Sequence, residues 1–110
     1  MPKTQIKVTD VYLYSLTNIE DFLLESAGTI QAIEVFLDEV SRVSLFIEQN
    51  PETPAPHPTT GDQSWPFGNG RYRVFFKVAL PNIYFLDIID NRMLNKDVYP
   101  NNSMPTYNLD

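Results

Sequence analysis

The alternation of apolar and polar positions predicts strands near both ends of the chain. Residues 5–14 alternate and are rich in Val and Tyr, which is typical of a strand. Because positions 11 and 13 make its second face apolar as well, we expect the end of this strand to be covered on both sides, as in an interior strand. Residues 71–80 alternate again, and residues 83–90 form a further strand after a turn at Pro81-Asn82. The strand over 71–80 has one face made of Tyr72, Val74, Phe76, Val78 and Leu80 and another made of Arg71, Arg73, Phe75 and Lys77.

Two helices are predicted between these strands. Thr17 or Asn18 suits the N-cap of a short first helix, and Gly28 is a natural C-terminal stop. The second helix starts at Thr29 and ends at Asn50-Pro51, because proline disfavours the helical conformation of the residue before it. Its apolar positions follow the i, i+3, i+4, i+7 spacing of an amphipathic helix: Ile33, Phe36, Leu37, Val40, Val43, Ser44 and Ile47.

A proline-rich stretch over residues 51–70 separates the helices from the later strands and predicts a loop. Residues 64–67 form an edge strand at its end, followed by a tight hairpin turn at Gly68-Asn69-Gly70. A short extension around residues 97–99 and a flexible tail over 100–110 complete the chain. The order of elements predicts one α+β domain over residues 1–99, in which an N-terminal strand leads into a two-helix hairpin packed on an antiparallel sheet of three to four strands.

Composition excludes several classes of site. The sequence has 110 residues and no cysteine, which excludes disulfides, thiolate zinc sites and a cysteine nucleophile. No pair of acids is spaced for a metal site or a glycosidase mechanism, so we expect neither a metal nor a cofactor. The apolar runs are far shorter than the roughly 20 residues that span a bilayer, and no apolar segment follows the first residues. We therefore expect a cytoplasmic protein without a membrane partner.

The charge is unevenly distributed. The formal net charge is −6, which argues against nucleic-acid binding over the whole surface. Residues 1–65 hold ten acids and three basic residues, whereas the rest of the chain holds four acids and five basic residues. If the last two strands pair across their turn, the guanidiniums of Arg73 and Arg92 converge and can bind a phosphate. Lys96 and Tyr99 follow closely enough to reach the same rim. An ordinary solvated sheet face is the alternative interpretation of this basic cluster.

Three stretches of sequence resemble the RelE/ParE superfamily of bacterial toxins. SRVSLFIEQNPE (residues 41–52) is similar to the end of that family's second helix, and FGNGRYRVFFKV (67–78) is similar to its central strand. IYFLDIIDNRMLNKDVY (83–99) is similar to its last strand and the Arg-containing segment that follows. The resemblance implies the toxin of a type II toxin–antitoxin, or plasmid-stabilisation, module, which a cognate antitoxin neutralises by wrapping the helices and the sheet.

Two activities occur in this superfamily. RelE-like members cut mRNA on the ribosome without a metal, using basic residues and often a C-terminal Tyr, whereas ParE-like members inhibit DNA gyrase and are not nucleases. By position, Arg73 matches the family's central-strand Arg, Arg92 matches the Arg after the last strand, and Tyr99 lies near the RelE tyrosine. The nuclease alternative therefore has Arg73 and Arg92 on the phosphate and Tyr99 near the ribose 2′-hydroxyl.

The ParE-like mode fits this sequence better than the nuclease mode. Residues 61–65 contain no basic side chain ahead of the central strand, and a metal-free nuclease needs cations to offset the charge that develops on the phosphate. We accordingly expect a growth inhibitor that acts on a target such as DNA gyrase. A third alternative is a degenerate, non-toxic binding module with the same fold. The residues expected to contact the target are Arg71, Arg73, Lys77, Arg92 and Lys96.

Overall fold

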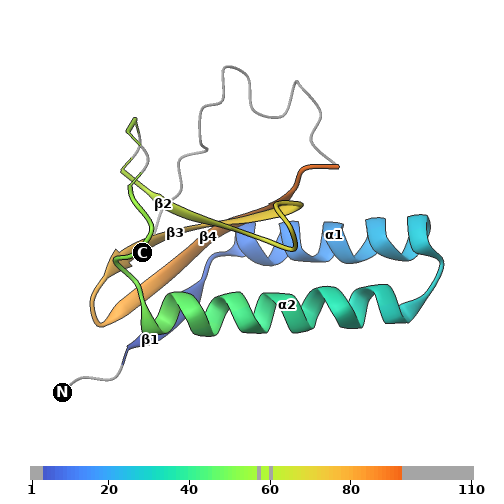
Figure 1. Cartoon of the computed structure of the whole chain (residues 1–110), viewed down its shortest axis with the longest axis horizontal. Coiled ribbons are helices and arrows are strands. Elements are labelled where there is room, and N and C mark those ends of the chain that lie inside the picture. The colour runs from blue at the N-terminus through green and yellow to red at the C-terminus, as the bar shows by residue number, and fades with distance from the viewer. Residues whose placement is uncertain (1–3, 57, 60, 93–110) are drawn as a thin grey trace.

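A four-stranded sheet carries two long helices on one of its faces (Figure 1). The computed structural model describes residues 4–56, 58–59 and 61–92. The elements in chain order are β1 (Gln5–Val8), α1 (Asp10–Ala27), α2 (Ile30–Gln49), β2 (Gln63–Phe67), β3 (Tyr72–Ala79) and β4 (Asn82–Asp90). The strand order is β1-β4-β3-β2. The α+β class and the helical hairpin are as predicted. The sheet is mixed rather than antiparallel, because β1 pairs with β4 in parallel.

The first strand is much shorter than predicted, and it lies at an edge of the sheet rather than in its interior. Thr9 ends it with an extended backbone, and its Oγ1 accepts a hydrogen bond from the amide of Tyr12, which makes Thr9 the N-cap of α1. The predicted cap Thr17 lies inside that helix, where its hydroxyl donates to the carbonyl of Leu13. Residues 10–14 alternate in the sequence, but the buried positions of α1 follow the helical spacing instead.

The predicted helix ends and the hairpin turn are confirmed. Gly28 ends α1 in the left-handed region with φ of 70°, and its amide donates to the carbonyl of Leu24 at 2.9 Å. Asn50 caps α2. The turn Gly68-Asn69-Gly70 has positive φ at all three residues, a conformation that glycine and asparagine adopt at low cost. Strand β2 lies at the other sheet edge, as its proline required. The predicted extension at 97–99 and tail over 100–110 lie outside the described residues.

The core lies between the helices and one face of the sheet. Phe36 of α2 packs against Tyr72 of β3 with ring centroids 4.8 Å apart, and Tyr12 of α1 packs against Phe85 of β4 at 5.5 Å. The even-numbered positions Tyr72, Val74 and Phe76 of β3 are buried in this core. Because side chains alternate along a strand, the odd-numbered positions of β3 face away from the helices. Two of them are basic, Arg73 and Lys77.

Candidate functional site

The predicted basic residues are divided between the two faces of the sheet. Arg73 and Lys77 lie on the face away from the helices, where Nη1 of Arg73 donates to Oγ of Ser64 at 2.6 Å. Arg92 lies on the helix side, since its guanidinium packs over the ring of Phe22 in α1. The predicted convergence of Arg73 and Arg92 is therefore wrong.

The strand register explains why these two arginines do not meet. Tyr72 pairs with Asp90, and Arg73 pairs with Ile89. Because side chains alternate along each strand, Asp90 lies on the helix side with Tyr72, and Arg73 lies on the opposite side. The chain then turns after Asp90, and the Arg92 side chain folds back onto the helix side.

Arg92 forms an ion pair with Asp90 at the end of β4. Nη2 of Arg92 lies 2.7 Å from Oδ2 of Asp90, and Nε lies 3.1 Å from Oδ1, which gives a bidentate contact. The amide of Arg92 also donates to Oδ1 at 2.8 Å. The Asp90 side chain is fully buried, whereas that of Arg92 is 37% exposed. The hydrogen bond to Asp90 is the main reason why the pKa of Arg92 is raised.

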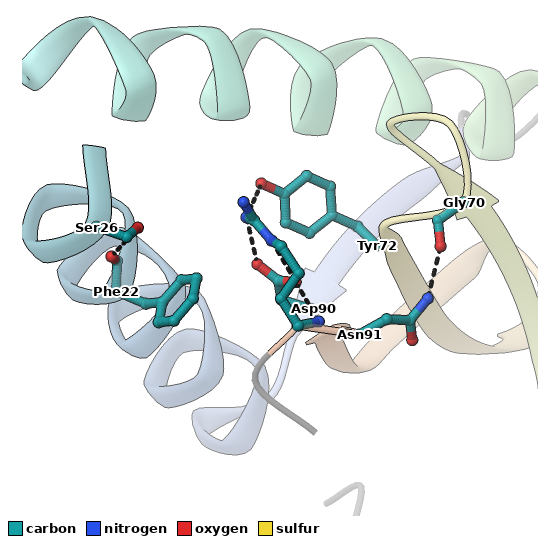
Figure 2. Close-up of polar contacts among 7 residues, drawn as sticks. Phe22, Ser26, Gly70, Tyr72, Asp90 and Asn91 are labelled. Carbon is teal, nitrogen blue, oxygen red and sulfur yellow. Dashed lines mark hydrogen bonds and ion pairs between the residues drawn. The ribbon is translucent and has the colours of Figure 1, made fainter. Parts of the chain in front are cut away.

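Tyr72 joins the ion pair to the core. Its hydroxyl oxygen accepts a hydrogen bond from Nη2 of Arg92 at 3.2 Å (Figure 2). The guanidinium carbon of Arg92 lies 5.2 Å from the ring centroid of Phe22 and 5.9 Å from that of Tyr72, within the range of cation–π contacts. Burial raises the pKa of the Tyr72 hydroxyl, and the neighbouring Arg71 and Arg92 offset this only in part. Tyr72 therefore keeps its proton at neutral pH.

The β2–β3 turn is fastened to the end of β4. The amide of Asn91 donates to the carbonyl of Arg71 at 2.8 Å. The Nδ2 atom of Asn91 donates to the carbonyl of Gly70 at 2.6 Å (Figure 2). These bonds fix the backbone of Gly70 and Arg71 beside the residue that precedes Arg92. Sequence reasoning grouped Arg71 with Arg73 and Lys77, but Arg71 precedes β3 and lies on the helix side.

Arg71, Tyr72 and Arg92 line a cavity of about 460 Å³ at the end of the helical hairpin. We call it the hairpin cavity. Its remaining lining residues come from the last turns of α1, the link between the helices and the first half of α2: Leu23, Ser26, Ala27, Thr29, Gln31, Ala32, Val35, Phe36 and Glu39. Sequence reasoning missed Tyr72 and Asp90 as partners of Arg92. The spacing Asp90-x-Arg92 was the one available signal for the ion pair.

Two of the predicted site residues, Lys96 and Tyr99, lie outside the described residues. Within the part of the chain that the structure describes, no group of three or more histidines and acids is placed to hold a metal ion. No helix there has the length and apolar character needed to cross a membrane.

Comparison with known proteins identifies the fold. No protein-family profile and no curated protein matches the sequence. Among solved structures, a chain of the chromosomal ParDE TA (toxin–antitoxin) system from P. aeruginosa is similar, with a TM-score of 0.68 and 18% sequence identity. The similarity covers 80% of this chain and 96% of that chain. The protein therefore has the α+β fold of that ParDE chain, in agreement with the RelE/ParE-like fold expected from the sequence.

Proposed function

We propose that this protein is the toxin of a type II toxin–antitoxin pair, that it acts as a ParE-like inhibitor of a cellular target such as DNA gyrase, and that a cognate antitoxin neutralises it. The observation that carries this proposal is the structural similarity to the ParDE chain, which extends over 96% of that chain rather than over one shared motif. The sequence resemblance over residues 41–52, 67–78 and 83–99 supports the same assignment.

The geometry of the basic residues favours the non-nuclease mode. A metal-free ribonuclease needs several cations around one phosphate. Here Arg73 and Arg92 lie on opposite faces of the sheet, and the charge of Arg92 is balanced by Asp90. Inhibition by binding needs no such convergence. We expect Arg73 and Lys77 to contribute to target contact from the face away from the helices, and Arg71, Arg92 and Lys96 remain candidates as well.

Growth after induction of this chain alone in bacteria tests the toxin assignment. We expect arrest with the wild-type chain and normal growth when the cognate antitoxin is co-expressed. The double substitution Arg73→Gln/Lys77→Gln should relieve the arrest. The control is Arg42→Gln, which removes a cation from α2, on the helix side of the sheet, where the Arg42 side chain is 79% exposed. Normal growth in the presence of soluble, folded wild-type protein would overturn the proposal.

A supercoiling assay with purified protein tests the target. We expect the chain to inhibit DNA gyrase or to trap cleaved DNA, and Arg73→Gln/Lys77→Gln to weaken this effect more than Arg42→Gln does. Unaffected supercoiling at large protein excess excludes gyrase. Mapping of mRNA 5′ ends in arrested cells addresses the nuclease alternative, because cuts at ribosomal A sites would replace the ParE-like assignment with a RelE-like one.

A further inference from the structure

The hairpin cavity contains hydrogen-bond donors that have no acceptor among the described residues. Arg92 donates through Nε and Nη2 to Asp90 and through Nη2 to Tyr72. An arginine side chain carries five N–H donors, so within the described part of the chain both donors on Nη1 remain after these three bonds. Because the Arg92 side chain is 37% exposed and lines the cavity, these donors are accessible to a ligand.

Tyr72 and Arg71 add donors beside Arg92. The Tyr72 oxygen accepts a hydrogen bond from Arg92. Its hydroxyl proton is therefore left to donate, and no acceptor for it lies among the hydrogen bonds of the described residues. Arg71 is exposed and lines the same cavity. Two guanidiniums and one hydroxyl thus present donors to one space.

The charge of the cavity lining distinguishes between anions. Asp90 offsets the charge of Arg92, and Glu39, which also lines the cavity, offsets that of Arg71, so these four side chains have no net charge. The Glu39 carboxylate lies toward the β2–β3 turn, near Gly68. A carboxylate fits this balance better than a doubly charged phosphate. Charge-assisted bonds from guanidinium to carboxylate are strong and directional.

The shape of the site favours a polypeptide over a small molecule. Leu23, Val35 and Phe36 provide an apolar wall next to the donors. A second cavity, of about 290 Å³, lies between α2 and β2 and is lined by Phe46 and Trp65, whose rings are tilted with centroids 4.9 Å apart. Glu39 lines both cavities. Both cavities thus lie along α2, an arrangement that matches an extended or helical segment with apolar side chains.

We infer that Arg71, Tyr72 and Arg92 bind the carboxylate of an acidic side chain carried by a partner polypeptide, with a neighbouring apolar side chain of that segment against Leu23, Val35 and Phe36. The inference goes beyond the proposed function, because it specifies the chemistry of a binding site and not the effect on growth. Asp90 holds Arg92 in position for this contact, and Asn91 holds Arg71.

Titration of the ¹⁵N-labelled protein with two short peptides tests the inference. The probe is N-acetyl-Leu-Glu-Leu-amide, and the matched control is N-acetyl-Leu-Gln-Leu-amide, which lacks only the charge. We expect the first peptide to shift the amide signals of Ala32, Arg71 and Tyr72. Because a hydrogen bond to a charged group contributes about 1.5–3 kcal/mol, we expect the glutamine peptide to bind at least about tenfold more weakly.

Three variants complete the experiment. Arg71→Gln and Tyr72→Phe each remove donors from the cavity and should weaken binding of the glutamate peptide several-fold. Lys77→Gln removes the same charge from the opposite face and should leave binding unchanged. Four outcomes would each overturn the inference. The two peptides bind equally well, Lys77→Gln and Arg71→Gln lose equal affinity for the glutamate peptide, the amide signals shift only at other surfaces, or the glutamate peptide does not bind. Peptide binding by a protein that leaves growth unchanged would sustain this inference while removing the toxin assignment.

Discussion

Replacement of Arg92 should destabilise the fold before it affects any interaction with a target. Asp90 is fully buried, and Arg92 supplies both of its side-chain donors. In Arg92→Gln the shorter neutral side chain does not reproduce the bidentate contact, and among the donors of the described residues Asp90 retains the amide of residue 92. A buried carboxylate without its cation is costly, whereas the exposed charge of an unpaired arginine is readily hydrated.

The structure sets the expected magnitude. Breaking a fully buried ion pair costs about 3–5 kcal/mol, and here one partner is 37% exposed. Solvent screening therefore lowers the expected loss for Arg92→Gln to about 2–3 kcal/mol. Asp90→Asn should cost less, about 1 kcal/mol, because it leaves the charge on the more exposed partner. The double substitution Asp90→Asn/Arg92→Gln removes both charges, so its loss should be smaller than the sum of the two single losses.

Urea unfolding followed by circular dichroism measures all three variants, and Arg71→Gln is the matched control. Arg71 is an exposed arginine beside the same tyrosine, and its replacement should change the free energy of unfolding by no more than about 0.5 kcal/mol. A loss below about 0.5 kcal/mol in Arg92→Gln itself, or strictly additive losses in the double variant, would refute the structural role of Arg92. Arg92 would then return to the set of residues that are free to contact a target.

Three further predictions concern the fold that positions the site. Burial raises the pKa of Tyr12 to about 12. The stability that the protonated Tyr12 hydroxyl contributes is therefore complete below pH 10 and is lost as the pH rises from 10 towards 12. Tyr12→Phe should flatten this decline in the free energy of unfolding, as measured by urea titrations at a series of pH values. Gly68→Ala should cost about 2–3 kcal/mol of stability, because a Cβ there would lie 2.7 Å from Cδ2 of Tyr72. A Cβ at Gly70 would have no atom within 4 Å, so Gly70→Ala should cost only the strain of its positive φ. Equal thermal unfolding temperatures of the two variants would contradict the contact at Gly68. Thr9→Ala should cost about 1 kcal/mol by loss of the α1 cap and Thr9→Ser much less, as measured by urea midpoints.

The elements that were predicted correctly are those whose signals are local. The apolar stripe of α2, the stop at Gly28 and the turn Gly68-Asn69-Gly70 each depend on residues within a few positions of one another. The start of α1 was misjudged because residues 10–14 are strong strand formers, and burial against β4 outweighed that local preference. The parallel pairing of β1 with β4 joins residues more than 70 positions apart, which no local pattern encodes.

The candidate site was harder to predict because it depends on register. The sequence identified the basic residues but not their faces, since a bulge between Phe75 and Phe76 and the turn after Asp90 decide where the last side chains point. Asp90 was visible as an acid two positions before Arg92, yet nothing in the sequence shows that it is fully buried. Position-by-position correspondence with a family therefore assigned Arg92 to a target, whereas the structure gives it an intramolecular partner.

The division of the basic residues between two faces constrains how a partner would neutralise this protein. If Arg73 and Lys77 contact the target, a segment bound only at Arg71 and Arg92 in the hairpin cavity would leave that surface uncovered. Neutralisation would then require the partner to pass around a sheet edge and reach the second face. The edge strand β2 is the nearer route, because the second cavity lies beside it and Trp65 is placed at its rim. Arg71→Gln should accordingly weaken neutralisation, and Arg73→Gln/Lys77→Gln should reduce toxicity while sparing partner binding in the cavity.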